Sequence, residues 1–344
     1  MSALQKGPDE AAGGERRAPL LELRQVSVRY PVGGRRRLTA VDAVDLRVHE
    51  GETLGIIGES GSGKSTIARA VLGLAPVSSG KLLWQGEDVS GFDRAQRREF
   101  VQAVQMVFQD PHSALDPRRT IAQSVREPLD VMRRGVRGSR QEVAMQALAD
   151  VGLTAEIAGR YPHQLSGGQK QRANIARALV TRPRLLICDE SVAALDVALQ
   201  AEILNLLQDL KVNYQLTIMF ISHDLSVVAH LADRMNVVYL GQVVEDATTT
   251  SMVDQPRHPY SEALLSAQPH VNLHEETNRI VLTGDIPSPL DPPPGCRFHT
   301  RCQHAIDRCA TTTPELTEAL PDHWAACLRT EELYGLTGRA KELI

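Results

Sequence analysis

The stretch Gly58-Glu-Ser-Gly-Ser-Gly-Lys-Ser65 decides how this chain of 344 residues is interpreted. Residues 53–57 before it are apolar and predict a short strand, and residues 66–74 after it carry apolar side chains at helical spacing. Glycines between a strand and a helix let backbone N–H groups and the positive helix end face one anion. The sequence therefore predicts a loop that binds the phosphate groups of a nucleotide.

The residue types of this loop fit nucleotide chemistry better than they fit a chance glycine-rich turn. We expect Lys64 to reach the β- and γ-phosphates and the Ser65 hydroxyl to bind Mg²⁺. The other loop residues assigned to nucleotide binding are Gly58, Ser60, Gly61, Ser62, Gly63 and Thr66.

Two carboxylates follow a second apolar strand pattern at residues 185–188. We expect Asp189 to hold Mg²⁺ through water and Glu190 to polarise the water that attacks the γ-phosphate. An Asp-Glu pair alone is more often a solvated strand end, but its place downstream of a phosphate loop favours the catalytic interpretation.

His223 and Gln109 complete the candidate catalytic residues. His223 follows the predicted strand 216–221, so it could contact the γ-phosphate or orient the attacking water. Gln109 could reach Mg²⁺ and the same water. Either residue alone would be uninformative, and both interpretations depend on the neighbouring motifs.

The order of the predicted elements indicates an α/β protein. Strands alternate with helix candidates at residues 141–151, 166–179 and 199–210, which favours a parallel core sheet. Residues 94–141 are polar and rich in Arg, Pro and Gln. Ser166 is a plausible N-cap for the helix that it precedes.

Composition narrows the class of protein. Hydrophobic residues are 42% of the chain, charged residues are 23%, and the net charge is −4, so overall charge does not indicate nucleic-acid binding. No apolar run approaches the ~20 residues that cross a bilayer. We therefore expect a cytosolic protein, or one bound to a membrane through other proteins, with a flexible tail at residues 1–19.

With Leu165-Ser-Gly-Gly-Gln169 and Ala194-Leu-Asp196 added, these motifs make the chain resemble the ATP-binding subunit of an ABC transporter. The resemblance implies a P-loop NTPase cassette over residues 20–255: a RecA-like core, an N-terminal antiparallel β subdomain and a helical signature subdomain. It also implies that Tyr30 stacks on adenine, the alternative being a strand-end core tyrosine.

The resemblance assigns catalytic roles and a second kind of nucleotide contact. Glu190 matches the catalytic base, Gln109 the Q-loop and His223 the switch histidine. The residues that match the signature contact to the ATP of the opposite subunit are Ser166, Gly167, Gly168, Gln169 and Asp196. The segment Ser191-Val-Ala-Ala-Leu-Asp196 departs from the more frequent Pro-Thr-Ser-Ala-Leu-Asp, but we still expect a competent site.

Residues 256–344 are similar to the C-terminal extension of dipeptide/oligopeptide importer ATPases. The similarity lies in His258-Pro-Tyr260, Gly284-Asp-Ile-Pro287 and the run Pro292–Cys302. It implies ATP-driven import of di- or oligopeptides. Alternatives are the same ATPase type serving nickel, glutathione or another small solute, or a soluble ABC ATPase acting on DNA or ribosomes.

The implied partners are a second ABC ATPase subunit, usually a paralogue, two transmembrane permease subunits and an external substrate-binding protein, with no nucleic acid. The implied location is peripheral, on the cytoplasmic face of the inner membrane. DNA- or ribosome-acting relatives usually carry a coiled-coil insertion or a second cassette, and this sequence shows neither.

Four of the five cysteines crowd the extension: Cys296, Cys302, Cys309 and Cys327. Their thiolates could hold zinc or an iron–sulfur cluster, and the absence of paired C-x2-C knuckles disfavours an ordinary zinc ribbon. The family resemblance favours a 4Fe–4S cluster, with four free thiols as the alternative. Cys188 lies in a predicted strand and should be a core residue.

Overall fold

The computed structural model describes residues 18–34, 36–110, 114–133, 136, 138–193, 195–267 and 279–335. Most of the predicted flexible tail, together with Ala194 of the motif Ala194-Leu-Asp196, lies outside these residues. Within the described part of the chain, no helix combines the length and apolar character that a membrane crossing requires.

An eight-stranded mixed sheet forms the centre of the molecule, with the strand order β11-β12-β10-β9-β3-β8-β7-β6. Its parallel members are β3 (Thr53–Ile57), β6 (Val104–Val107), β7 (Leu185–Asp189), β8 (Thr217–Ile221) and β9 (Arg234–Tyr239). Strands β3, β7 and β8 are buried along their whole length, which explains their continuous apolar sequences. The predicted parallel core is therefore present, extended by antiparallel strands at one edge.

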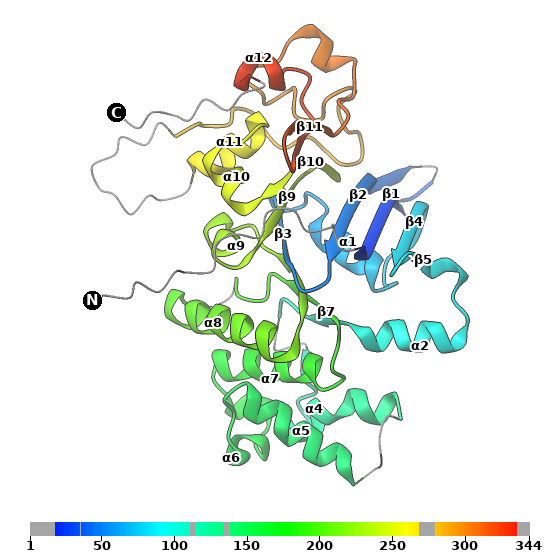
Figure 1. Cartoon of the computed structure of the whole chain (residues 1–344), viewed down its shortest axis with the longest axis vertical. Helices are drawn as coiled ribbons and strands as arrows, with labels where there is room; N and C mark the ends of the chain where they lie inside the picture. The colour runs from blue at the N-terminus through cyan, green and yellow to red at the C-terminus, as the bar shows by residue number, and fades with distance from the viewer. Residues whose placement is uncertain are drawn as a thin grey trace, which may run out of the picture.

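A smaller antiparallel sheet precedes this core and has the order β2-β1-β4-β5. Its strands are β1 (Pro19–Pro31), β2 (Arg37–His49), β4 (Val77–Trp84) and β5 (Glu87–Asp88). Helix α1 (Lys64–Val71) lies beside β2 and shares one apolar core with both sheets, to which Ile67, Val44 and Met219 all belong (Figure 1). The expected N-terminal β subdomain thus packs against the helix that follows the phosphate loop.

Helices make up the opposite end of the molecule (Figure 1). They are α4 (Ile121–Val131), α5 (Ser139–Asp150), α6 (Ala155–Ala158) and α7 (Gly167–Leu179). Helix α7 contacts both β6 and α8 (Val197–Tyr214). Helix α9 (Leu225–Leu231) packs against β3. The apolar faces of α4, α5 and α7 join the same core cluster as β7 and β8.

The polar stretch 94–141 contains elements that its composition does not predict: α2 (Arg94–Ala103), β6 and α4. Local start signals are nevertheless present. Asp93 and Gln96 form a capping box before α2, and Thr120 and Gln123 form another before α4. These reciprocal hydrogen bonds satisfy N–H groups of the first helical turn, so they fix both helix starts.

The C-terminal residues extend the central sheet rather than forming a detached appendage. Strand β12 (His323–Ala325) pairs with β10 (Gln242–Thr248), and β11 (Thr317–Leu320) pairs with β12. Buried His323 binds Glu245 through Nε2 at 2.6 Å and Ser251 through Nδ1 at 2.7 Å. The remaining helices here are α10 (Thr249–Asp254), α11 (Pro259–Ser266) and α12 (Thr330–Tyr334).

Candidate nucleotide site

The glycine-rich loop connects the end of β3 to the start of α1, as the sequence predicts. Its backbone needs glycine, because Gly58, Gly61 and Gly63 have φ values of 152°, 79° and 109°. A Cβ atom on Gly58 would lie 2.2 Å from the Val238 carbonyl oxygen, and one on Gly63 would lie 2.4 Å from that of Ala40. The loop is therefore tightly enclosed by its own chain.

Lys64 is buried inside this loop, with 4% of its surface exposed. Its Nζ donates to the carbonyl oxygens of Gly58 and Glu59 at 2.8 and 2.9 Å. Burial lowers the pKa of Lys64, while the carboxylates of Glu190 and Asp189 oppose that shift. The ammonium group is thus aimed at the interior of the loop, where phosphate oxygens would replace carbonyl partners.

Ser65 and Asp189, the two residues expected to hold Mg²⁺, lie within hydrogen-bond distance of each other. The Ser65 hydroxyl donates to the Asp189 carboxylate at 2.8 Å. Burial raises the pKa of Asp189, and the Ser65 hydrogen bond lowers it. A hydroxyl and a carboxylate at the open end of a parallel sheet match the oxygen ligands that Mg²⁺ prefers, so these residues fit the ion.

Glu190, Gln109 and His223 meet beside this pair, as expected from the sequence. Gln109 Nε2 donates to Glu190 Oε2 at 2.6 Å, and His223 Nδ1 lies 3.6 Å from Glu190 Oε1. They follow β7, β6 and β8, whose carboxyl ends lie at one edge of the sheet. Glu190 has a φ of 46°, an uncommon value for a residue with a side chain, and its N–H donates to Ile221 at 2.9 Å.

Helix α7 holds the segment around Gln109 from both sides. Asn174 donates to the carbonyl oxygen of Phe108 at 3.2 Å, and Arg177 donates to that of Ala114 at 3.0 Å. These hydrogen bonds connect the segments on either side of Gln109 to helix α7.

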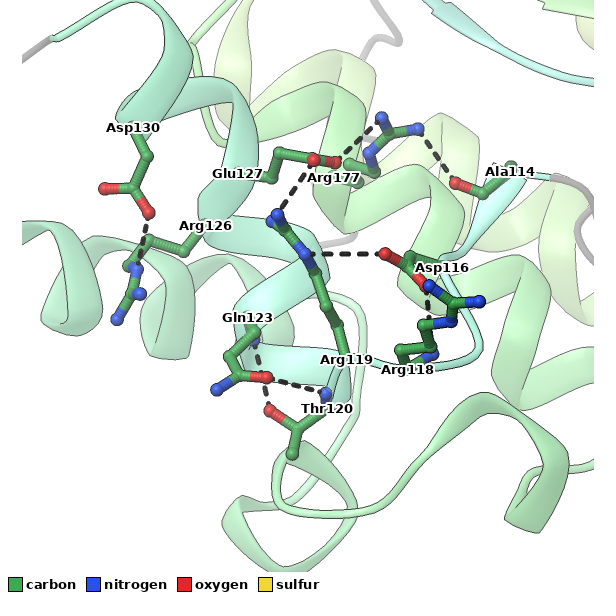
Figure 2. A network of polar contacts seen from close by, with 10 residues as sticks. All are labelled: Ala114, Asp116, Arg118, Arg119, Thr120, Gln123, Arg126, Glu127, Asp130 and Arg177. Atoms are coloured by element: carbon green, nitrogen blue, oxygen red, sulfur yellow. Dashed lines mark hydrogen bonds and ion pairs between the residues drawn. The ribbon is translucent and has the colours of Figure 1, made fainter.

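An ion-pair network continues from Arg177 into the helical region (Figure 2). Glu127 of α4 pairs with Arg177 at 3.3 Å and with Arg119 at 3.1 Å. An open cavity of about 470 Å³ adjoins the network, lined by Arg119, Gln123, Arg126, Glu127, Asp130 and Val131. The network joins α4 to α7, so both helices are expected to move together.

The second glycine motif starts helix α7. The Ser166 hydroxyl accepts from Gln169 N–H at 3.3 Å, and Gln169 Oε1 accepts from Ser166 N–H at 3.1 Å. Ser166 and Gly167 are exposed, whereas a Cβ on Gly168 would lie 3.1 Å from Leu199. Asp196 caps the neighbouring helix α8 by accepting from Leu199 N–H at 3.0 Å. These contacts support an open helix start that presents backbone N–H groups outward.

Tyr30 lies near the end of β1, opposite Leu38 of β2. It is half-buried and packs against the core shared by the two sheets.

The four clustered cysteines converge. Cys296, Cys302, Cys309 and Cys327 line one small cavity of about 10 Å³ together with apolar side chains such as Phe298. Burial raises the pKa of Cys296 to about 11 and also raises that of Cys302 and Cys327.

No set of three or more ligand side chains in the described residues is grouped to hold a metal ion, so the expected metal site is not found in preassembled form. Cys188 is the core residue that the sequence predicts, and burial raises the pKa of its thiol to about 12.

The sequence assigns no role to Glu59, yet this residue of the phosphate loop is held by the extension. Arg301 contacts its carboxylate at 2.7 and 3.0 Å. No local pattern reveals the pair, because the two residues are 242 positions apart. The only sequence signal is the position of Arg301 in the run that resembles importer extensions.

Comparison with known proteins gives matches over both parts of the chain. The family model "ABC transporter" matches residues 41–193, and "Oligopeptide/dipeptide transporter, C-terminal region" matches residues 244–309. The oligopeptide transport ATP-binding protein AppF of Bacillus subtilis is 45% identical, with 90% of this chain and 96% of AppF covered. OppF of Salmonella typhimurium is also 45% identical, with 93% and 98% covered.

A solved structure agrees with the fold. The dimeric ATP-binding cassette MJ0796, bound to ADP and Pi, superimposes with a TM-score of 0.60 at 29% identity. The match covers 67% of this chain and 98% of that cassette.

Proposed function

This chain belongs to the ATP-binding proteins of ABC transporters, in the oligopeptide/dipeptide branch, and we propose that it hydrolyses ATP to power peptide import through a membrane transporter. The observation that carries the proposal is the meeting of Gln109, Glu190 and His223 beside the phosphate loop. The oligopeptide/dipeptide-type extension in the same chain supports peptides as the cargo class.

The geometry supports a distinct role for each residue in hydrolysis. Lys64 and the loop N–H groups neutralise the phosphate charge as it shifts in the transition state. Ser65 and Asp189 would hold Mg²⁺, which would supply positive charge to stabilise the phosphate oxygens. Glu190 accepts the proton of the attacking water, with Gln109 and His223 positioning that water and the γ-phosphate.

The open start of α7 supports a composite site shared by two ATPase subunits. Ser166 and Gly167 are exposed. Ser166 contacts Gln169 and Gly168 lies against Leu199, so these contacts are not with Lys64 of the same chain. In this proposal the signature residues and Asp196 contact the partner's ATP, and Tyr30 stacks on this subunit's adenine. ATP binding then favours the closed dimer, and hydrolysis releases it.

An apolar groove beside Gln109 supports contact with a membrane subunit. It has a volume of about 230 Å³ and lies where α1, α2, β6, α4 and α7 meet. Leu74, Val101 and Phe108 line it and are 65%, 44% and 40% exposed. An amphipathic helix of a permease subunit fits such a groove. Because Phe108 adjoins Gln109, the groove connects that helix to the catalytic centre.

We also propose that the four extension cysteines hold a 4Fe–4S cluster. Their convergence on one apolar cavity supports this ligand set. The absence of paired C-x2-C spacings disfavours an ordinary zinc ribbon. A visible absorption spectrum with iron analysis of anaerobically purified protein tests the cluster; a colourless, iron-free protein would exclude it.

The complete assembly in this proposal has a second ATPase subunit, a paralogue, with two permease subunits and an external binding protein. The chain lies at the cytoplasmic face of the membrane, with residues 20–255 as the ATP-binding domain and 256–344 as the extension.

Uptake into vesicles tests the function. Vesicles that contain the assembled transporter and ATP should accumulate a labelled oligopeptide in the presence of the binding protein, and omission of this chain should abolish accumulation. Uptake of nickel or glutathione in place of peptide would support the alternative cargoes. Co-purification with ribosomes or DNA, without a membrane partner, would contradict the importer function.

A further inference from the structure

A loop of the C-terminal extension lies directly against the phosphate loop. Arg301 forms a two-pronged ion pair with Glu59, with Nη1 to Oε2 at 2.7 Å and Nη2 to Oε1 at 3.0 Å. The Arg301 side chain is 6% exposed and that of Glu59 is 24% exposed. Paired hydrogen bonds of this kind fix orientation as well as charge, and limited solvent access weakens their screening.

The backbone of Glu59 is also held. Its N–H donates to the Tyr260 hydroxyl at 2.8 Å, and its carbonyl oxygen accepts from Lys64 at 2.9 Å. Glu59 is therefore fixed at three points, two of which belong to the extension. The third belongs to the lysine that we assign to the phosphates.

Aromatic rings hold the two extension residues in place. Tyr260 lies 4.7 Å from Tyr239 and 5.3 Å from Phe298 between ring centroids, and all three side chains are at most 2% exposed. The Arg301 guanidinium lies 5.9 Å from the centre of the Tyr239 ring. Because Tyr239 ends β9 in the central sheet, the contact with Glu59 starts from a rigid support.

The charge of Glu59 gives this contact a consequence for nucleotide binding. A carboxylate inside a loop that binds polyphosphate repels the ligand unless a cation compensates it. Arg301 supplies that cation, and the hydrogen bonds that it donates to Glu59 hold the pKa of Arg301 above its ordinary value. Loss of Arg301 would leave the carboxylate uncompensated beside the phosphates.

We propose that Arg301 and Tyr260 are positioning residues for the phosphate loop, so that the C-terminal extension sets the ATP affinity of the cassette. Arg301 neutralises Glu59, and Tyr260 fixes the Glu59 N–H. The inference rests on ATP binding at this loop, which is part of the proposed function. It gives the extension a role in nucleotide binding that is separate from any group held by its cysteines.

The test measures ATP affinity of the full-length chain with a fluorescent ATP analogue. Arg301→Gln removes the charge but keeps a side chain that can hydrogen-bond, and we expect affinity to fall about tenfold. The double variant Glu59→Gln/Arg301→Gln removes both charges and should return affinity to within about threefold of the original chain. Arg308→Gln is the matched control, since Arg308 is an exposed arginine of the same extension.

Tyr260→Phe is an independent variant that removes only the hydroxyl, and we expect affinity about threefold weaker. In the assembled transporter, Arg301→Gln should raise KM for ATP while kcat stays within about twofold. A merely structural role would lower the melting temperature of Arg301→Gln without rescue of affinity by Glu59→Gln.

Equal ATP affinity in Arg301→Gln and the original chain would overturn the proposal, as would a double variant as weak as the single one. If Arg301→Gln does not fold, Tyr260→Phe provides the test. Unchanged ATP affinity in Tyr260→Phe would then overturn the proposal. Failure of the original chain to bind the analogue would instead refute the proposed ATPase function.

Discussion

Two helix starts in this chain are built from glycine and serine, and they differ in how completely the chain surrounds them. The loop before α1 is enclosed. Lys64 is 4% exposed, and Tyr260 and Arg301 of the extension both contact Glu59 of the loop. The start of α7 is open, with Ser166 and Gly167 exposed. The chain thus encloses one glycine-rich helix start and leaves the other facing outward.

The difference teaches that similar local motifs serve different chemistry. The enclosed loop lies beside Asp189 and Glu190, so charge neutralisation and proton transfer can occur there. In the proposed function, the open start offers N–H groups and a helix dipole to a ligand held by another subunit. In the proposed dimer, the first site binds this subunit's ATP and the second binds the partner's.

The largest expected effect comes from the carboxylate beside the enclosed loop. Glu190→Gln should lower ATP turnover of the assembled transporter by at least about 100-fold while ATP still binds, because the amide cannot accept the proton of water. Steady-state hydrolysis and analogue binding measure the two properties. Exposed Glu202→Gln is the control and should retain turnover; a normal rate in Glu190→Gln would refute its assignment as the base.

Backbone substitution should show how tightly the first loop is enclosed. Gly63→Ala places a Cβ 2.4 Å from a backbone oxygen at a φ of 109°, so we expect a loss of about 2–3 kcal/mol in unfolding free energy and weaker ATP binding. Gly61→Ala has a φ of 79° and open space around the new Cβ, so about 1 kcal/mol is expected. Chemical denaturation compares them, and equal losses would contradict tight enclosure at Gly63.

Acid should lower the stability of the folded chain at the helix whose Tyr260 contacts the enclosed loop. His258 caps the helix that carries Tyr260, and burial lowers its pKa to about 3 from the ordinary 6.5. The unfolded chain therefore binds a proton below pH 6.5 that the folded chain does not bind until about pH 3, so stability falls as pH falls through this window.

The expected loss from His258 is about 2 kcal/mol between pH 6.5 and 5. His258→Asn keeps a capping side chain and should reduce that loss, as measured by denaturation at both pH values. Exposed His163→Asn should leave the pH dependence unchanged, and an identical pH dependence in His258→Asn would contradict the assignment.

The smallest expected effect tests the open helix start. Ser166→Ala removes the cap of α7, costs about 1 kcal/mol of stability and should lower hydrolysis by the dimer about tenfold. ATP binding to the isolated chain should stay within about twofold, since the motif serves the partner's nucleotide. Thr120→Ala removes the matching cap of α4 and should cost similar stability with hydrolysis retained. If Ser166→Ala and Thr120→Ala lost hydrolysis equally, the loss would reflect helix stability, and Ser166 would have no separate role at the partner's ATP.

The nucleotide loop and its strand were predictable because both depend on local sequence. Glycine spacing, the apolar strand at 53–57 and the Ser166 cap each act within a few residues. Helices α2 and α4 were not predicted from their polar composition, although Asp93 and Thr120 mark their starts. They become stable by burying a few apolar residues, such as Phe100 and Val125, against distant elements.

By itself, the sequence determined the phosphate loop, the carboxylates Asp189 and Glu190 at the end of β7, and the family of the chain. These features depend on residue type and short-range order. Only the tertiary structure decided that β12 continues the central sheet and that Arg301 compensates the charge of Glu59. Strand pairing and ion pairing across such separations depend on how distant segments pack together, which no local pattern specifies. The structure thereby joins the extension to the glycine-rich loop through Tyr260 and Arg301.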